Sequence, residues 1–225
     1  MLGLNLRLEN KMNIKKPRFL SVFIGFVMSL FALISTTAYA QNSDLKQIFT
    51  QLSASSVVRA NFVQHKKLAS LNKTYVSKGT VVFTKNSGVL WQIQSPVKAD
   101  LIVTSKKVVQ KTQRTYSQIE VDKTPYGSVA TMFLQLMSGN ETALAKNFNV
   151  VSANYSPTKW NVSLTPKSGL FKKLFVKVDG QGQRYVDQIV IQEQANNSTT
   201  IRFSQQTAQP QTLTATENAL FQLAK

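Results

Sequence analysis

Along most of the chain after residue 57, apolar and polar residues alternate, and this two-residue period is typical of β-strands with one buried face. Short polar or glycine-containing segments separate the alternating stretches and predict tight turns, as at Asn86-Ser87-Gly88. In the first half of the chain the pattern predicts strands over residues 58–63, 76–85, 89–94, 100–104, 107–113 and 118–121.

A helical period replaces the alternation in a few segments. Leu45, Ile48, Phe49 and Leu52 stand at helical spacing after Ser43-Asp44, which predicts a helix beginning at that pair. Residues 126–137 also have helical character and end at Ser138-Gly139, and a shorter helix is expected over 141–147.

Alternation returns in the last third of the chain. It predicts strands over residues 150–153, 160–165, 174–179, 184–192 and 199–204. Strands outnumber helices about three to one and their connections are short, which favours antiparallel pairing over βαβ units. The sequence therefore predicts a mainly β (α+β) fold in one domain over residues 41–225.

The first forty residues have the pattern of an export signal. A cationic run, with Lys15, Lys16 and Arg18, precedes an apolar stretch over residues 19–34, and Ala38-Tyr39-Ala40 follows. This A-x-A sequence predicts cleavage before Gln41 and export of the mature protein. An uncleaved N-terminal anchor is the alternative, and Met12 is a second candidate for the start of translation.

Positive charge dominates the chain after the predicted cleavage. Residues 1–40 hold five of the 27 basic residues and one of the 10 acidic ones, so residues 41–225 carry a net charge of about +13. Export and the scattered placement of the cations argue against nucleic acid as a partner. Two interpretations stay open: a solvated basic surface, or docking on an anionic membrane or protein surface.

The sequence offers no catalytic or metal-binding motif. It contains no cysteine, and His65 is its only histidine, so we expect His65 to be an exposed residue at a strand end and not a metal ligand. Glu120 and Asp122 are two apart and resemble a carboxylate pair, although charged residues of this kind also protect an edge strand. A secreted hydrolase is therefore not favoured.

Several local sequences, in this order, resemble the outer-membrane lipoprotein carrier family, LolA. They are Ala60-Asn61-Phe62-Val63-Gln64, Gly79-Thr80-Val81-Val82-Phe83-Thr84-Lys85 followed by Leu90-Trp91, Pro96 with Leu101-Ile102-Val103, Thr124-Pro125, and Val162-Ser163-Leu164-Thr165-Pro166-Lys167.

The resemblance implies a fold and a function. The fold is an incomplete antiparallel β-barrel with a helical lid over an apolar cavity. The implied function is a monomeric, non-enzymatic carrier in the periplasm, without a cofactor, which takes acylated lipoproteins from an inner-membrane transporter and passes them to an outer-membrane receptor. A lipid-sensing regulator on the same fold is the alternative.

Strand and helix periodicity indicates which side chains would line such a cavity. An alternative is that the sheet and the helix pack together as a solid core. The predicted lipid-binding residues are Val58, Phe62, Val81, Phe83, Val89, Trp91 and Ile102 from the strands, and Val129, Met132, Phe133, Leu136 and Met137 from the helix.

Three departures from the family pattern put the cargo in question. Lys85 stands where the family has an arginine that holds the helical lid closed, so the resemblance implies a weaker latch at Lys85; a lysine that reaches past the rim into water is the alternative. Ser105-Lys106 replaces an Asp-Gly turn, and the terminal extension of well-known members is expected to be missing. A divergent member carrying another acylated lipid fits these departures.

Overall fold

The computed structural model describes residues 36–121, 134, 141–167 and 169–225 of the 225-residue chain. Its internal contacts divide the chain into two units, residues 1–39 and 40–225. All of the described strands belong to the second unit.

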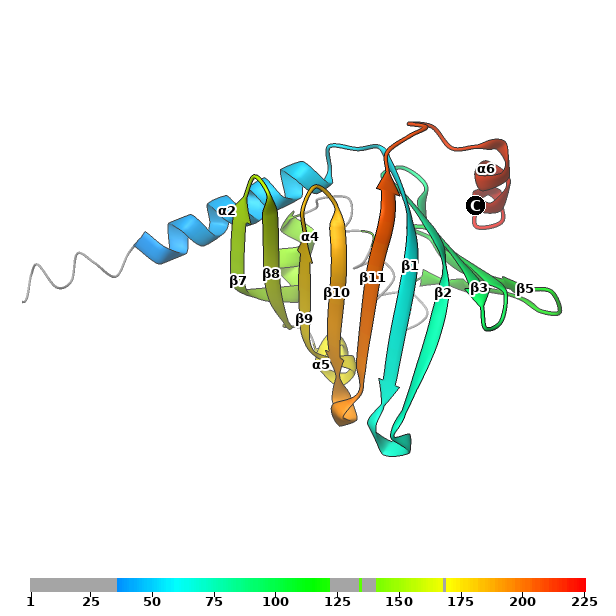
Figure 1. Ribbon diagram of the computed structural model, residues 1–225, viewed down its shortest axis with the longest axis horizontal. Coiled ribbons are helices and arrows are strands. Elements are labelled where there is room, and N and C mark those ends of the chain that lie inside the picture. Colours follow the sequence, from blue (N-terminus) through cyan, green and yellow to red (C-terminus); the bar gives the residue numbers. More distant parts are fainter. Residues whose placement is uncertain (1–35, 122–133, 135–140, 168) are drawn as a thin grey trace, which may run out of the picture. The chain divides into compact units, whose positions relative to one another are not determined.

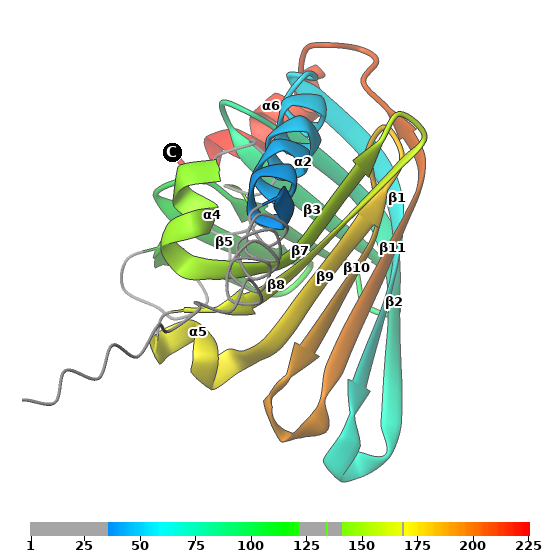
Figure 2. The ribbon, with the colours of Figure 1, turned by 90° about the vertical axis from the view of Figure 1, so that its left-hand side faces the viewer.

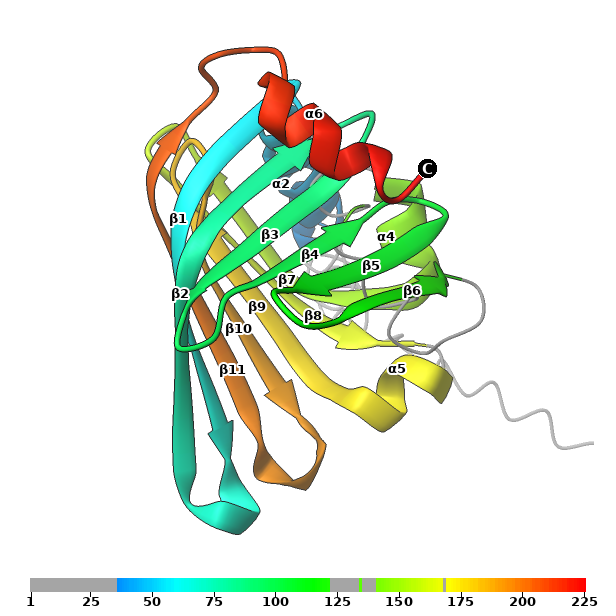
Figure 3. The ribbon, with the colours of Figure 1, turned by 90° about the vertical axis from the view of Figure 1, so that its right-hand side faces the viewer.

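Eleven antiparallel strands form one open sheet in the order β6-β5-β4-β3-β2-β1-β11-β10-β9-β8-β7. The two edge strands, β6 and β7, do not pair with each other, so the sheet is curved but not closed into a barrel (Figures 2 and 3). The strands are β1 (Val57–Leu68), β2 (Lys73–Thr84), β3 (Gly88–Ser95), β4 (Ala99–Val103), β5 (Lys107–Thr112), β6 (Tyr116–Glu120), β7 (Phe148–Ser156), β8 (Lys159–Pro166), β9 (Phe175–Gly182), β10 (Val186–Glu193) and β11 (Ser198–Thr207).

Chain order and sheet order differ at one place. Strands that pair in the sheet are also consecutive in the sequence, except at its centre, where β1 pairs with β11. The first half of the chain therefore builds one side of the sheet and the second half builds the other, with β1 and β11 between them (Figure 1).

Helices lie on both sides of the sheet. Helix α2 (Thr36–Leu52) and helix α4 (Glu141–Asn147) lie on the concave side, whereas α6 (Ala215–Gln222) crosses the outer face of β1–β5 (Figures 2 and 3). Helix α5 (Gly169–Leu174) leads into β9. The structure confirms the predicted mainly β class.

The curved sheet has two buried apolar clusters, one on each face. The larger cluster fills the concave face and includes residues of α2, α4 and most strands. The smaller one joins Val82, Leu90 and Ile102 of the outer face to Phe221 of α6. Strand alternation explains this division, because adjacent residues of one strand belong to opposite clusters.

Polar contacts fix α6 on the outer face. The Arg59 guanidinium bonds both carboxylate oxygens of Glu217, at 2.7 Å each, and also donates to the carbonyl oxygens of Pro210 and Thr212. Glu217 also belongs to the helix cap, since it accepts from the Thr214 backbone N–H while its own N–H donates to the Thr214 hydroxyl.

Several sequence expectations need correction. The first helix begins at Thr36 and not at Ser43-Asp44, because the preceding alanine-containing residues continue the helix without a break. Helices α5 and α6 were not predicted; they are only six and eight residues long, too short for a clear period. The predicted helix over 126–137 lies outside the described residues, apart from the helical position 134.

His65 was also misplaced. It lies within β1, which continues to Leu68, and its side chain is half-buried, with a buried Nδ1 that has no hydrogen-bond partner among the described residues. Glu120 lies in the exposed edge strand β6, and Asp122 lies outside the described residues.

Candidate functional site

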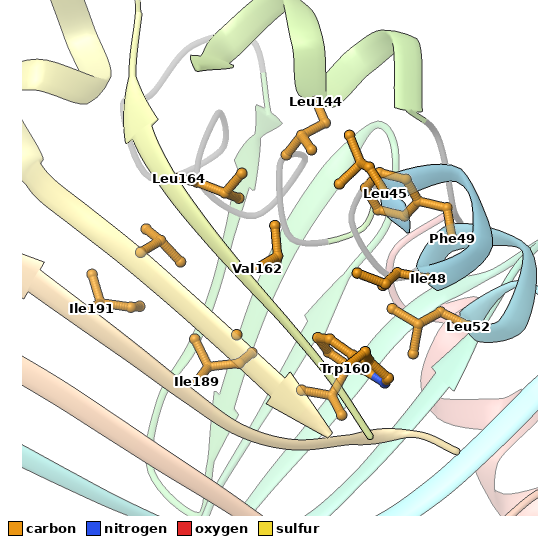
Figure 4. A pocket seen from close by; sticks show the side chains of 13 residues that line it. Leu45, Ile48, Phe49, Leu52, Leu144, Trp160, Val162, Leu164, Ile189 and Ile191 are labelled. Atoms are coloured by element: carbon orange, nitrogen blue, oxygen red, sulfur yellow. The ribbon is translucent and has the colours of Figure 1, made fainter. Parts of the chain in front are cut away.

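An apolar pocket lies between α2 and the second half of the sheet (Figure 4). Every residue of its described lining is apolar or glycine. The lining consists of Leu45, Ile48, Phe49 and Leu52 from α2, Leu144 from α4, Trp160, Val162 and Leu164 from β8, Val178 and Gly180 from β9, and Val186, Ile189 and Ile191 from β10.

Simple periodicity places these side chains together. The four α2 residues recur at i, i+3, i+4 and i+7, so they form one stripe that faces the sheet. On β8 the lining residues are two apart, at Trp160, Val162 and Leu164, and therefore share the concave face.

The glycine at the centre of β9 leaves space in this wall. A Cβ atom at Gly180 would lie 3.3 Å from Val162 Cγ1 and 3.6 Å from Trp160 Cζ3. Any larger residue here would reach into the volume beside the Trp160 ring. The remaining free space is about 60 Å³.

A few hydrogen bonds hold the carboxyl-terminal half of α2 at the end of the pocket. Gln51 donates to the carbonyl oxygens of Gln183 and Arg184 in the β9–β10 turn, and its Oε1 accepts from the Tyr155 hydroxyl at 3.2 Å. Asp44 accepts from the Tyr155 backbone N–H at 3.2 Å. Apolar contact with the sheet accounts for most of the remaining burial of this helix.

Trp160, whose ring lines the pocket, buries its own polar atom beside the wholly apolar lining. The side chain is only 3 % exposed, and its indole N–H has no hydrogen-bond partner among the described residues. A buried donor without a partner is unfavourable, because it has lost its bond to water. An acceptor atom on a bound molecule would satisfy it.

The strand residues that the sequence nominated lie mainly on the other half of the concave face. Val58, Phe62, Val81, Phe83 and Val89 are buried in the larger cluster, with Trp91 half-buried against it. The packing here is dense: the rings of Phe62 and Trp91 lie 4.1 Å apart, and Val81 is 0 % exposed. Among the described residues of this half, small hollows of about 20 Å³ and 10 Å³ lie beside Val58 and Phe83. The lipid-binding role of these side chains stays a prediction.

Ile102 lies on the wrong face for the predicted role. Strand β4 pairs with β3 so that Trp91 is opposite Leu101, whereas Ile102 is opposite Leu90. Directly paired residues share a face, so Leu101 faces inward and Ile102 packs in the outer cluster beneath α6.

Lys85 follows the last residue of β2 and is exposed. It borders a small hollow of about 20 Å³ together with Val58, Phe83, Val89 and Leu134. Its backbone N–H donates to the Ser56 carbonyl, but within the described part of the chain its ammonium bonds no carbonyl oxygen. The predicted latch and the solvated lysine both remain open.

The five helical residues predicted to bind lipid, Val129, Met132, Phe133, Leu136 and Met137, lie outside the described residues. Sequence reasoning found the apolar stripe of α2 and the alternation of β8 and β10, but it did not assign either to the site. Two sequence patterns could have indicated the site: the apolar stripe of α2, and the apolar residues two apart at Trp160, Val162 and Leu164.

Two features are absent from the described residues: a metal-binding cluster and a helix suited to span a membrane. No cluster of three or more histidine, cysteine or acidic residues is placed to hold a metal ion. Within the same residues, no helix has the length and apolar character needed to cross a bilayer.

A curved, open antiparallel sheet with helices against its concave face and an apolar pocket beneath one of them is consistent with an open β-barrel fold of the LolA type. The sequence model of the family "Outer membrane lipoprotein carrier protein LolA" matches residues 53–223. This chain therefore belongs to the LolA family, whose proteins are periplasmic carriers or binding proteins.

Solved structures with a similar arrangement are distant in sequence. A LolA superfamily protein from Nitrosomonas europaea has 9 % identity and a TM-score of 0.44, with 75 % of this chain and 93 % of that chain covered. A putative outer membrane lipoprotein-sorting protein domain from Vibrio parahaemolyticus has 9 % identity and a TM-score of 0.41, covering 79 % and 97 %. LprF from Mycobacterium bovis has 12 % identity and a TM-score of 0.35, covering 76 % and 96 %. No curated protein matches the chain.

Proposed function

We propose that this protein is a periplasmic carrier that binds the acyl chains of lipoproteins, or of a related acylated lipid, and transfers them from the inner to the outer membrane. Its partners on this proposal are an inner-membrane transporter and an outer-membrane receptor, and any nucleotide hydrolysis belongs to the transporter. Family membership supports the class of function, and the apolar pocket beneath α2 supports the kind of ligand.

The wholly apolar lining is the observation on which the proposal depends. Each buried methylene contributes about 0.8 kcal/mol, so a tail of roughly sixteen carbons leaves a bilayer at a cost of more than ~10 kcal/mol. A carrier must offset this cost with an apolar surface of similar extent. The side chains between α2 and β8–β10 provide such a surface once they are separated.

The pocket must open to take a ligand of that size. Its free space of about 60 Å³ is well below that of ordinary ligand sites, which are about 300–1,000 Å³. Helix α2 is the element whose movement would enlarge it, because four of its side chains form one wall. The hydrogen bonds of Gln51 and Asp44 are few, so this movement breaks little besides apolar contact.

Native mass spectrometry of protein recovered from the periplasm of expressing cells tests the proposal. We expect bound acyl species on the wild type and their loss in Val162→Phe, which adds volume to the half-buried pocket wall. Val190→Phe is the matched control, because Val190 is also half-buried but alternates with Ile189 and Ile191 and so faces away from the pocket.

Loss of acyl species from both variants, or their absence from the wild type, would contradict the proposal. A second measurement separates a carrier from a lipid-sensing regulator. A carrier passes its bound lipid to outer-membrane vesicles that contain a receptor, whereas a sensor retains it.

A further inference from the structure

One end of the sheet is built from three segments that are held to one another. They are the β1–β2 turn with its 3-10 helix (Ala69–Leu71), the β10–β11 turn with its 3-10 helix (Gln194–Asn196), and α5 (Figures 1 and 2). The Ala69 N–H donates to Asn197 Oδ1 at 2.9 Å, and Gln194 Nε2 donates to the Lys172 carbonyl at 2.7 Å. We call this surface the basic end.

The basic end concentrates positive charge. Within the described residues only two of its lysines have a carboxylate partner: Lys66 pairs with Glu193 and Lys177 with Asp179. The segment of residues 63–78 contains four lysines and no acidic residue. At the basic end, the lysines that are exposed and have no acidic partner among the described residues are Lys67, Lys73, Lys172 and Lys173.

Large apolar side chains are exposed among these cations. Leu71 is 56 % exposed at the turn, and Tyr75 and Val76 of β2 are 51 % and 40 % exposed. Val76 and Tyr75 alternate along the strand, so they point to opposite faces of the hairpin. Apolar side chains are thus available at the turn and on both faces of the same hairpin.

We propose that the basic end docks on an anionic lipid bilayer. Lysines within reach of anionic headgroups are attracted to them, and leucine and tyrosine beside them can enter the headgroup region, which is the combination found in peripheral membrane proteins. The β1–β2 hairpin is also long enough to bring its turn to a bilayer while the opposite end of the sheet stays in water. Strand β1 extends over about 36 Å from Val57, near the α6 end, to Leu68. This inference does not depend on whether the pocket holds an acyl chain.

Vesicle co-sedimentation tests the inference with protein recovered from the periplasm. The probes are vesicles of phosphatidylcholine alone and vesicles of phosphatidylcholine mixed with phosphatidylglycerol. We expect binding only to the anionic vesicles, with an affinity that falls as salt is raised. Lys67→Gln with Lys73→Gln is expected to weaken binding by about fivefold for each lysine, or about 25-fold together.

The control removes two exposed lysines that lie away from the basic end, Lys106 in the β4–β5 turn and Lys159 at the start of β8. Lys106→Gln with Lys159→Gln leaves the same net charge as the test variant, so its binding should stay within about twofold of the wild type. Leu71→Ser should also weaken binding, because it removes an exposed apolar side chain that would enter the headgroup region. The site is exposed, so the change should not disturb the fold.

Equal losses in the test and control pairs would overturn the inference in favour of attraction by net charge alone. Absence of binding to anionic vesicles would also overturn it. If the protein fails to bind these vesicles but Lys67→Gln with Lys73→Gln weakens its capture of a periplasmic protein, the basic end binds a protein and not a bilayer. All variants share one N-terminus, so residues 1–40 cannot account for a difference between them.

Discussion

The ion pair between Arg59 and Glu217 should contribute measurably to the free energy of unfolding. The two side chains are only 17 % and 12 % exposed, and they join β1 to the cap of α6. Exposed ion pairs contribute about 0.2–1 kcal/mol, whereas removing one partner of a buried pair costs about 3–5 kcal/mol. Arg59 keeps the carbonyl oxygens of Pro210 and Thr212 as acceptors when the carboxylate is lost. We therefore expect Glu217→Gln to lower the free energy of unfolding by about 2–3 kcal/mol.

Urea denaturation measures this loss, and Asp179→Asn provides the matched control. Asp179 pairs with Lys177 at 3.0 Å, but both side chains are about one-third exposed, so the expected loss is below about 1 kcal/mol. A double-mutant cycle with Arg59→Met should give a coupling energy above ~1 kcal/mol. Equal losses in Glu217→Gln and Asp179→Asn, or additive effects in the cycle, would refute the reasoning.

The same contact predicts a pH dependence. The hydrogen bond from Arg59 lowers the pKa of Glu217 below its ordinary value of 4.5, although burial acts in the opposite direction. The unfolded chain therefore takes up this proton at a higher pH than the folded chain, and stability rises with pH in that interval. The difference in unfolding free energy between wild type and Glu217→Gln should be constant above the ordinary pKa. It should shrink as the pH falls from 4.5 through the lowered folded-state pKa.

Three other substitutions test separate parts of the structure. Trp160→Phe removes the unpaired indole N–H that lies buried beside the pocket. If a ligand oxygen reaches this donor when α2 moves, the substitution should weaken the binding of palmitate esters by about fivefold in a ligand-displacement assay; unchanged affinity would show that no ligand oxygen uses it. Gly79→Ala would place a Cβ atom 1.9 Å from the Gln92 carbonyl oxygen, so we expect a lower urea midpoint, and an unchanged midpoint would refute the close approach of β2 and β3. Lys85→Leu should alter the rate of cargo release if this residue latches the lid, and unchanged loading and transfer would exclude the latch.

The strands could be predicted from the sequence because alternation is a local signal. Residues 76–85 and 89–94 were expected as paired strands, and β2 and β3 cover nearly those ranges. The face of each strand was harder to assign. On β4 three apolar residues are consecutive, from Leu101 to Val103, so the pattern alone does not say which of them points inward. The register with β3 decides it, and register depends on tertiary contacts.

The pocket could not be located from the sequence for a different reason. Apolar residues at Val81 and Phe83 look the same in the sequence as those at Val162 and Leu164, yet only the second pair lines the pocket beneath α2. A cavity depends on small residues that leave space as well as on the apolar residues that line it. Gly180 is the position that matters, because a Cβ atom there would meet the Val162 side chain.

The two halves of the concave face carry different groups of side chains. In the first half, the Trp91 ring lies 4.1 Å from Phe62 and 6.1 Å from Phe203, and Phe83 lies 6.1 Å from Phe203, between ring centres. In the second half, Phe148, Phe171 and Phe175 form an aromatic group of their own, whereas Trp160, Gly180 and aliphatic side chains line the apolar pocket beneath α2. Because α2 supplies one wall of this pocket and its described hydrogen bonds to the sheet are those of Gln51 and Asp44, we expect a ligand to enter by displacing α2 and not by separating eleven hydrogen-bonded strands.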